Sequence, residues 1–496
     1  MSTPEHDDPL TDVETIVVGA GFAGVGLGIQ LVRAGRTSFV ILERADDVGG
    51  TWRDNTYPGV ACDVPSHLYS FSFHPKADWS RVFSPGAEIW QYLRDAARDE
   101  GVLPHVRLGA DMRTCRWDPQ ARRWIVHTSS GTYTGRFLVL AAGHLADEKL
   151  PDIPGVESFP GDLFHSARWR HDRPLAGKRV GVVGSGASAI QIVPSIVDDV
   201  SELVIFQRSA PWLMPRRDRA YSDAEKRMFQ RDPASRVSVR TEWFWNLEFN
   251  YAARRRLEPF FSGAKAVARA HLASQVPDPD LRHKLTPDYE LGCKRVLISS
   301  DFYPAVAKDN VTLEPSALSR VDGSSAISAA GNSYELDTLV FATGFEAADP
   351  PFAANVYGKD GRSLAEHWAG GMHALQSAGV PGFPNMFIIN GPNTGLGHNS
   401  VVYMIESQLR YVLGAMDYAD QHALATLEPD AGAERTYLAE VRQRSEGTVW
   451  LEGGCRSWYV DPGSGELTII WPDFAHVFRD RNSVFEPSGY AVTGAY

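Results

Sequence analysis

Cysteines are few in this sequence and long apolar runs are missing, and each shortage argues against a class of protein. The 496 residues include only four cysteines, Cys62, Cys115, Cys293 and Cys455, with no CxxC pair. Such wide spacing argues against a zinc site, a disulfide framework and a dithiol–disulfide reductase. We therefore expect no metal site and free thiols in a reducing cytoplasm. No apolar run approaches the ~18 residues of a membrane span, so we expect no transmembrane segment.

An excess of positive charge is also missing. The chain has 49 lysines and arginines against 61 aspartates and glutamates, which gives a net charge of −12. This balance argues against the broad basic surface of a nucleic-acid-binding protein. The N-terminal stretch MSTPEHDDPL is acidic and lacks the pattern of a signal peptide, so we expect a cytoplasmic protein. At this length, with 43% hydrophobic residues, the composition predicts two or three globular domains.

A glycine motif lies between two apolar runs near the N-terminus, in TIVVGAGFAGVGLGIQLVRAGRTSFVILE (15–43). Gly19, Gly21 and Gly24 form GxGxxG between a predicted strand and a predicted helix. The first glycine makes the tight turn, the second lets the backbone approach a pyrophosphate, and the third lets the helix pack on the strand. The next strand ends at Glu43, and an acid there accepts hydrogen bonds from ribose hydroxyls. This pattern predicts a site for FAD or NAD.

The same layout returns in RVGVVGSGASAIQIVPSIVDDVSELVIFQR (179–208). Gly184, Gly186 and Ala189 stand in the three glycine positions. Arg208 follows Gly184 at the spacing at which Glu43 follows Gly19, so the second copy ends on a base. An arginine there suits the 2′-phosphate of NADP. Two dinucleotide sites in one chain suggest hydride transfer from a nicotinamide to a flavin.

The remaining patterns predict the domain organisation. FLVLAAG (137–143) and LDTLVFATGF (336–345) both read as a buried strand followed by a small-residue turn, and PDIPGVESFPG (151–161) reads as a linker. We expect an α/β fold with two Rossmann-like dinucleotide-binding domains, the second inserted in the first. The expected bounds are 1–170 and 336–496 for the FAD domain and 171–335 for the NADP domain, with a helical subdomain at about 220–290.

A third stretch near the C-terminus, residues 385–414, reads as a strand, a glycine- and asparagine-rich loop and a helix. The loop begins near Asn390, and it would bring backbone amides and the helix N-terminus toward a polar cofactor ring. His398 in this loop is either a proton donor or a structural hydrogen-bonding residue.

The stretch GGTWRDNTYPGVACD (49–63) resembles the second fingerprint of the type I Baeyer–Villiger monooxygenases at every defined position. A further fingerprint of that family, FxGxxxHxxxW, is matched by Phe159, Gly161, His165 and Trp169. The family continues with Pro or Asp, where this chain has Arg170. Three other stretches also resemble the family: CKRVLISSDFYPAVAKDNV (293–311), GPNTGLGHNS (391–400) and SWYVDPGSGELTIIWP (457–472).

The resemblance implies an FAD- and NADPH-dependent monooxygenase. Through a flavin peroxide it would insert one oxygen atom of O2 beside a ketone carbonyl to give an ester or lactone. By this comparison Arg295 is the catalytic guanidinium, because a fixed positive charge stabilises the developing oxyanion. Asp63 would hold Arg295, Lys294 would join Arg208 on the 2′-phosphate, and His165 would act at a hinge between the domains.

The residues expected to bind the two cofactors come from both glycine turns and from the motifs of the resemblance. They are Gly19, Gly21, Gly24, Glu43, Arg44, Trp52, Asp63, Tyr69, Gly184, Ser185, Gly186, Ala187, Ser188, Ala189, Gln191, Arg208, Lys294 and Asn390.

Two alternatives stay open at this point. A related class B flavin monooxygenase that oxidises sulfur or nitrogen shares much of the layout, but it gives less reason for Arg295. A cofactor-binding sensor or partner protein would be expected to lack Arg295 or Asp63, and both are present. We expect a small ketone and O2 as the reaction partners, no nucleic acid, and a monomer or homodimer.

Overall fold

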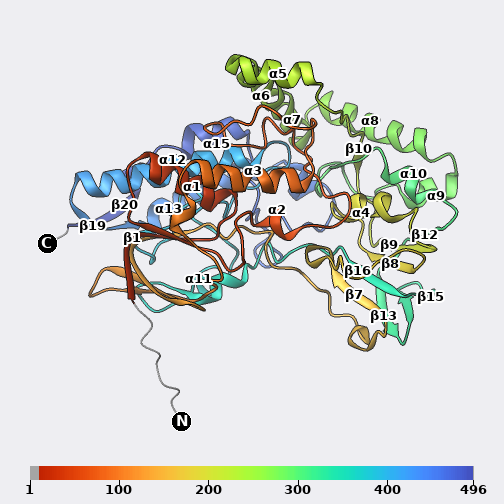
Figure 1. The fold of residues 1–496 in the computed structure, drawn as a ribbon, viewed down its shortest axis with the longest axis horizontal. Helices are drawn as coiled ribbons and strands as arrows, with labels where there is room; N and C mark the ends of the chain where they lie inside the picture. Colours follow the sequence, from red (N-terminus) through yellow and green to blue (C-terminus); the bar gives the residue numbers. More distant parts are fainter. Residues whose placement is uncertain (1–9, 495–496) are drawn as a thin grey trace, which may run out of the picture.

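The computed structural model describes residues 10–494, and these form two large β-sheets with helices around them (Figure 1), together with three smaller sheets of two or three strands. All but the last residue of the acidic N-terminal stretch considered above lies outside the described residues. No helix within residues 10–494 is both long enough and apolar enough to cross a membrane.

The first sheet has β1 near its centre and contains strands from distant parts of the chain. β1 pairs in parallel with β2 and with β6, whereas β4, β5 and β6 form an antiparallel meander. In order across the sheet its strands are β17 (Val356–Tyr357), β4 (Met112–Asp118), β5 (Arg123–Thr128), β6 (Gly131–Leu140), β1 (Leu10–Val18), β2 (Phe39–Leu42) and β3 (Val106–Arg107), and β18 (Met386–Ile388) pairs with β6.

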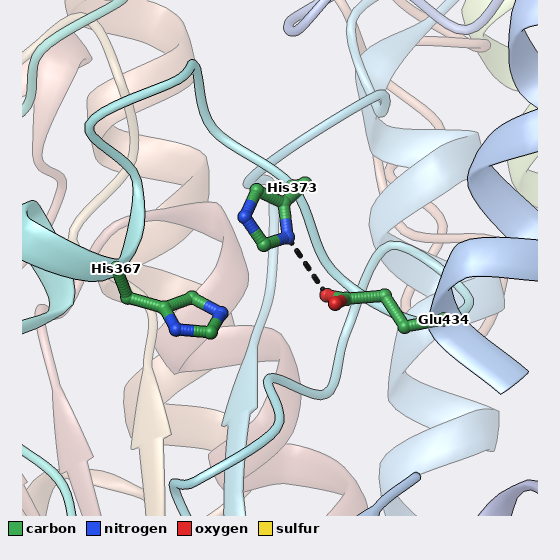
Figure 2. Close-up of side chains that lie close together, drawn as sticks. All are labelled: His367, His373 and Glu434. Carbon is green, nitrogen blue, oxygen red and sulfur yellow. Dashed lines mark hydrogen bonds and ion pairs between the residues drawn. The ribbon is translucent and has the colours of Figure 1, made fainter. Parts of the chain in front are cut away.

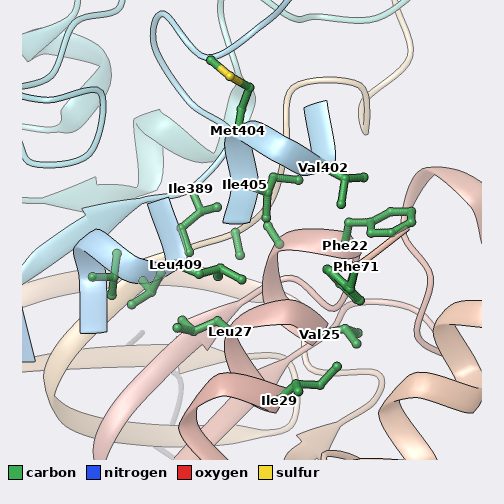
Figure 3. Packing of buried hydrophobic residues seen from close by; sticks show 14 of the residues in the cluster. Phe22, Val25, Leu27, Ile29, Phe71, Ile389, Val402, Met404, Ile405 and Leu409 are labelled. Atoms are coloured by element: carbon green, nitrogen blue, oxygen red, sulfur yellow. The ribbon is translucent and has the colours of Figure 1, made fainter. Parts of the chain in front are cut away.

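Both faces of this sheet are covered, which explains why its central strands read as continuous apolar runs. Successive side chains of a strand point to opposite faces. Val17 therefore joins the cluster that includes α1 (Phe22–Arg33), α3 (Gly86–Asp99) and α12 (Val401–Gln421). Its neighbour Ile16 joins the cluster around Trp124 on the other face. Figure 3 shows Leu27 of α1 packing near Leu409 of α12 in the first cluster.

The second sheet lies at the opposite end of the molecule from β1, and all its strands are parallel (Figure 1). The helices α4 (Ala189–Ile196) and α10 (Phe302–Val306) pack on it through one apolar cluster. A small antiparallel sheet and a two-stranded pair accompany it. The strands of the second sheet are β12 (Val311–Glu314), β9 (Glu202–Phe206), β8 (Arg179–Val183), β16 (Thr338–Phe341) and β7 (Asp162–His165). The smaller strands are β13 (Leu318–Asp322), β14 (Ser325–Ser328), β15 (Ser333–Glu335), β10 (Leu213–Met214) and β11 (Leu297–Ile298).

The second sheet extends beyond the expected bounds of 171–335 at both ends. β7 precedes residue 171 and β16 follows residue 335, yet both pair within this sheet. The chain then returns to the first sheet at β17 and β18. By their pairing, β7 and β16 therefore belong to the second sheet. The chain segment that forms the second sheet is inserted between segments that form the first.

Helices fill the region expected to form a helical subdomain. The first of them, α5, begins with a capping box in which Ser222 and Glu225 satisfy each other's backbone donors. These helices are α5 (Asp223–Arg231), α6 (Pro233–Glu248), α7 (Asn250–Arg254), α8 (Phe260–Gln275) and α9 (Pro279–Lys284). The other helices and strands are α2 (Thr51–Asp54), α11 (Leu364–His367), β19 (Leu424–Pro429), α13 (Ala431–Ser445), α14 (Val449–Glu452), α15 (Ala475–Asn482) and β20 (Tyr490–Gly494).

Candidate active site

The first glycine turn has the geometry of a phosphate-binding loop. Gly19 has φ +103°, and a Cβ on it would lie 2.6 Å from the carbonyl oxygen of Ala141. A Cβ on Gly24 would lie 1.8 Å from the Gly19 oxygen, so helix and strand pack too closely for any side chain there. No side chain caps the N-terminus of α1, and the N-cap residue is Gly21 itself. The free N–H groups of that first turn are suited to a pyrophosphate.

The carboxylate of Glu43 is held beside this turn. It accepts hydrogen bonds from the backbone N–H of Ala20 at 2.9 Å and of Ala45 at 3.0 Å. Arg53, which is almost fully buried, forms an ion pair with it at 3.0 Å. Sequence reasoning missed Arg53, although it lies inside the 49–63 stretch. Arg44, also expected at the cofactor, forms an ion pair with Asp147 at 2.7 Å.

The second glycine turn repeats the first one. Gly184 has φ +116°, and its Cβ would lie 2.5 Å from the carbonyl oxygen of Ala342, the residue after β16. Ala141 follows β6 in the same way in the first domain. A Cβ at Gly186 would have no atom within 4 Å, so the backbone there is open to a ligand. The next positions of the turn are Ser185, whose hydroxyl donates to the Ser209 carbonyl, the exposed Ala187, the N-cap Ser188 and the buried Ala189.

Arg208 and Lys294 meet beside the second turn. Arg208 is exposed, and none of the described residues forms an ion pair with it. Lys294 donates to the Ser209 hydroxyl at 2.7 Å. Burial, and then the positive charge of Arg208, lower the pKa of Lys294. Two cations brought together at the end of a strand favour an anion such as a phosphate.

Gln191, another residue expected at the cofactor, contacts the Tyr57 loop of the first domain. Its side-chain amide donates to the Ala61 carbonyl at 2.9 Å and its oxygen accepts from the Tyr57 hydroxyl at 3.0 Å. Gly59, with φ +81°, packs so closely against α4 that a Cβ would lie 2.2 Å from the Ser195 Oγ. The Tyr-Pro-Gly part of the 49–63 stretch therefore forms a contact between the two domains.

Arg295 and Asp63 form the charged centre between the domains. The Nη2 atom of Arg295 lies 2.6 Å from Oδ2 of Asp63, and its Nε lies 3.2 Å from the same oxygen. The carboxylate charge of Asp63 raises the pKa of Arg295, which stays charged at any working pH. The Arg295 side chain is still 41% exposed, so part of its guanidinium remains available for another partner.

The aromatic and amide residues expected at the flavin also gather near the first turn. The rings of Trp52 and Tyr69 meet edge to face with centroids 5.5 Å apart, and Tyr69 makes a similar contact with Phe22 at the start of α1. Burial raises the pKa of the Tyr69 hydroxyl. Asn390 has φ +59°, and its buried Oδ1 has no partner among the described residues. An unpaired buried acceptor of this kind fits a polar ligand group.

The two histidines singled out from the sequence are both buried. His398 lies 3.1 Å from the carboxylate of Glu248 on α6, and Asn399 donates to the same carboxylate at 2.8 Å. These contacts favour the structural role for His398. His165 ends β7, where its Nδ1 accepts from the Ala167 backbone and burial lowers its pKa.

The expectation of four free thiols is wrong for two of the cysteines. Cys293 and Cys455 form a disulfide across 162 residues of sequence. Only Cys62 and Cys115 are free, and both are buried. Wide spacing in the sequence does not measure distance in space, and the segment before Lys294 packs against the C-terminal residues after α14. The bridge thus fixes the segment that carries Arg295.

Together the fold and the site define a two-cofactor oxidoreductase, with one dinucleotide turn that ends on an acid and another that ends beside two bases. A family model described as pyridine nucleotide-disulphide oxidoreductase matches residues 16–228, which include both glycine turns.

Comparison with curated proteins identifies the family. A protein from Streptomyces coelicolor named Baeyer-Villiger monooxygenase is 46% identical over 493 residues, which covers 98% of this chain and 94% of that protein. One of the same name from Pseudomonas aeruginosa is 39% identical over 494 residues and covers 99% and 94%. The chain belongs to the Baeyer–Villiger monooxygenases, and this confirms the predicted family, reaction class and cofactor class, an NADPH-dependent flavin monooxygenase.

Solved structures agree with this assignment. The structure titled "Oxidized steroid monooxygenase bound to NADP" has a TM-score of 0.85 and 29% identity, and the match covers 98% of this chain and all of that one. A closed structure of cyclohexanone monooxygenase has a TM-score of 0.86 and 26% identity over the same shares. The α/β fold with two dinucleotide-binding domains is therefore confirmed.

Proposed function

We propose that this chain uses FAD and NADPH to insert one oxygen atom of O2 next to a ketone carbonyl. The products are an ester or lactone, NADP⁺ and water, which balances one O2, one NADPH and one proton. The ion pair between Arg295 and Asp63 carries this proposal. This pair places a permanent cation, the partly exposed guanidinium of Arg295, between the FAD domain and the NADP domain.

The residues around the first turn fit FAD. Gly21 and the first turn of α1 would hold the pyrophosphate, and Glu43 would hold the ribose. Trp52 would pack near the flavin ring of FAD. The unpaired Oδ1 of Asn390 would accept a hydrogen bond from that flavin ring. When bound and reduced by NADPH, FAD would supply the electrons that activate O2.

The residues around the second turn fit NADPH. The open backbone at Gly186 would bind the pyrophosphate, and Arg208 with Lys294 would bind the 2′-phosphate. Both cations lie in the inserted domain, which we propose extends from about β7 to β16. Gln191 acts on the cofactor site indirectly, because it holds the Tyr57 loop against α4.

Arg295 is the proposed catalytic residue and Asp63 its positioning residue. When oxygen is transferred to a ketone, negative charge develops on the attacking oxygen and then on the former carbonyl oxygen. A guanidinium fixed in place stabilises both without reorganisation. Asp63 uses one oxygen for two donors of Arg295, which fixes the orientation of the guanidinium plane.

Oxidation of a sulfide or amine forms no oxyanion from a carbonyl group. That reaction therefore gives less reason for a fixed guanidinium such as Arg295 held by Asp63. We therefore propose the ketone as the substrate class. A cytoplasmic location and a monomeric or homodimeric state stay predictions.

The experiment is a substrate panel with the purified FAD-loaded protein. NADPH consumption should rise when a ketone is added, and one ester should form for each NADPH consumed, as measured by gas chromatography. Matched sulfides should be converted more slowly. Sulfoxide formation without ester across the panel would contradict the proposed substrate class.

A further inference from the structure

Three side chains of types that can bind a metal converge at a place outside the residues proposed to hold either cofactor. His367 ends α11, His373 lies in the loop that follows, and Glu434 lies in the first turn of α13. One ligand atom from each lies within 4.8 Å of the other two. Figure 2 shows His367 and Glu434 approaching from opposite sides of His373. These residues come from segments about sixty residues apart in sequence, and the fold brings them together.

The contacts within this cluster leave one nitrogen unexplained. His373 lies 2.9 Å from the Glu434 carboxylate through its Nδ1, and that hydrogen bond accounts for the pair. The His367 Nε2 is buried and has no partner among the described residues. Its ring is held between His373, with centroids 4.8 Å apart, and Phe383. A buried polar atom without a partner is unfavourable, so this nitrogen is free to bind a ligand.

The donor set specifies the chemistry of that ligand. Two imidazoles and one carboxylate suit zinc and similar divalent transition metals, whereas magnesium and calcium prefer oxygen ligands throughout. Ligands about 2.1 Å from a tetrahedral ion lie roughly 3.4 Å apart, so the side chains need to close by about 1.4 Å at most. Of the three side chains, only His373 also lines a neighbouring cavity of about 100 Å³.

We propose that His367, His373 and Glu434 bind one divalent transition-metal ion of the zinc class. The backbone around the site is already fixed for this purpose. Trp368 donates its indole N–H to the His373 carbonyl at 2.8 Å, and Asp430 caps α13 one turn before Glu434. The bound ion ties the loop after α11 to α13. This proposal differs from the sequence-based expectation that the chain has no metal site.

The test measures zinc binding to the FAD-loaded protein after treatment with a chelator. Calorimetry with zinc chloride and elemental analysis should give about one zinc per chain, and zinc should raise the thermal midpoint. His367→Gln and Glu434→Gln should each weaken zinc binding by at least about tenfold. Even the substitution of residues that only hydrogen-bond to metal ligands lowers metal affinity by about 10- to 100-fold. His283→Gln, at an exposed histidine of α9, is the matched control and should bind zinc like the wild type.

Failure to bind zinc stoichiometrically would overturn the proposal. Equal binding by the wild type and by both ligand variants would overturn it as well, since the zinc would then lie elsewhere on the surface. Should a variant fold poorly, a wild-type crystal soaked in zinc decides the question. An anomalous peak within bonding distance of His367, His373 and Glu434 supports the site, and zinc found only elsewhere refutes it.

Discussion

Replacing Arg208 by alanine should change the choice of coenzyme and leave the rest of the enzyme intact. Arg208 is exposed two residues after β9 ends, and none of the described residues forms an ion pair with it, so its removal breaks no ion pair of the fold. A hydrogen bond to a charged group contributes about 1.5–3 kcal/mol. At 25 °C this corresponds to a loss of roughly 10- to 150-fold in kcat/KM for NADPH. The value for NADH, which has no 2′-phosphate, should change by less than about twofold.

The assay compares kcat/KM for both coenzymes at one fixed salt concentration, because screening weakens phosphate contacts. Arg208→Glu copies the acid of the first domain and should reverse the preference toward NADH, since a carboxylate repels the 2′-phosphate. Arg320→Ala removes an exposed arginine of β13 in the same domain and is the matched control. Equal losses for NADPH and NADH in Arg208→Ala would show that Arg208 does not bind the 2′-phosphate.

Three further predictions address the framework around the site. Cys455→Ser should lower the free energy of unfolding by about 2–4 kcal/mol. Adding Cys293→Ser should lower it no further, because each substitution removes the same disulfide bond. Additive losses in urea unfolding would contradict the disulfide. Gly59→Ala should destabilise the protein and slow turnover more than Gly177→Ala, because both glycines have positive φ but only Gly59 packs against α4; equal effects on melting temperature and rate would refute that contact. Burial alone would raise the pKa of Glu248, but its hydrogen bonds, led by that of His398, lower this pKa to about 2. The ionised carboxylate therefore stabilises the fold fully above pH ~4.5, the usual pKa of a glutamate. This contribution to the free energy of unfolding is lost as the pH falls from ~4.5 to ~2. Denaturant titrations across that range should show a flatter acid limb for Glu248→Gln, and an unchanged slope would count against the assignment.

Local patterns predicted much of the fold. Each glycine turn depends on residues within one short strand–turn–helix–strand unit, so its small residues and the acid or base after the second strand could be recognised in the sequence. The structure explains them by close backbone contacts, such as that of Gly19 with Ala141 and of Gly184 with Ala342. The pairing of Arg295 with Asp63 followed only from the resemblance, because 49–63 and 293–311 are far apart in the chain.

Features that depend on distance through space could not be predicted in this way. The disulfide joins Cys293 to Cys455 because two loops pack together, and no spacing rule indicates that. Gln191 follows the second glycine turn closely enough to suggest a cofactor contact, yet its side chain reaches the Tyr57 loop of the other domain. For a similar reason the local sequence could not show that β7 and β16, which lie outside the expected bounds of 171–335, pair within the second sheet.

The most direct test of the account is the rate of ester formation by Arg295→Ala. FAD should remain bound, and reduction by NADPH should persist in stopped-flow measurements, because neither the Gly19 turn nor Arg208 is altered. Loss of one fixed donor should lower ester formation by about 10²- to 10³-fold, with NADPH oxidation then yielding hydrogen peroxide. Arg217→Ala, at an exposed arginine, should retain wild-type ester formation. Ester formation by Arg295→Ala within a few-fold of wild type would contradict the proposed role of this residue.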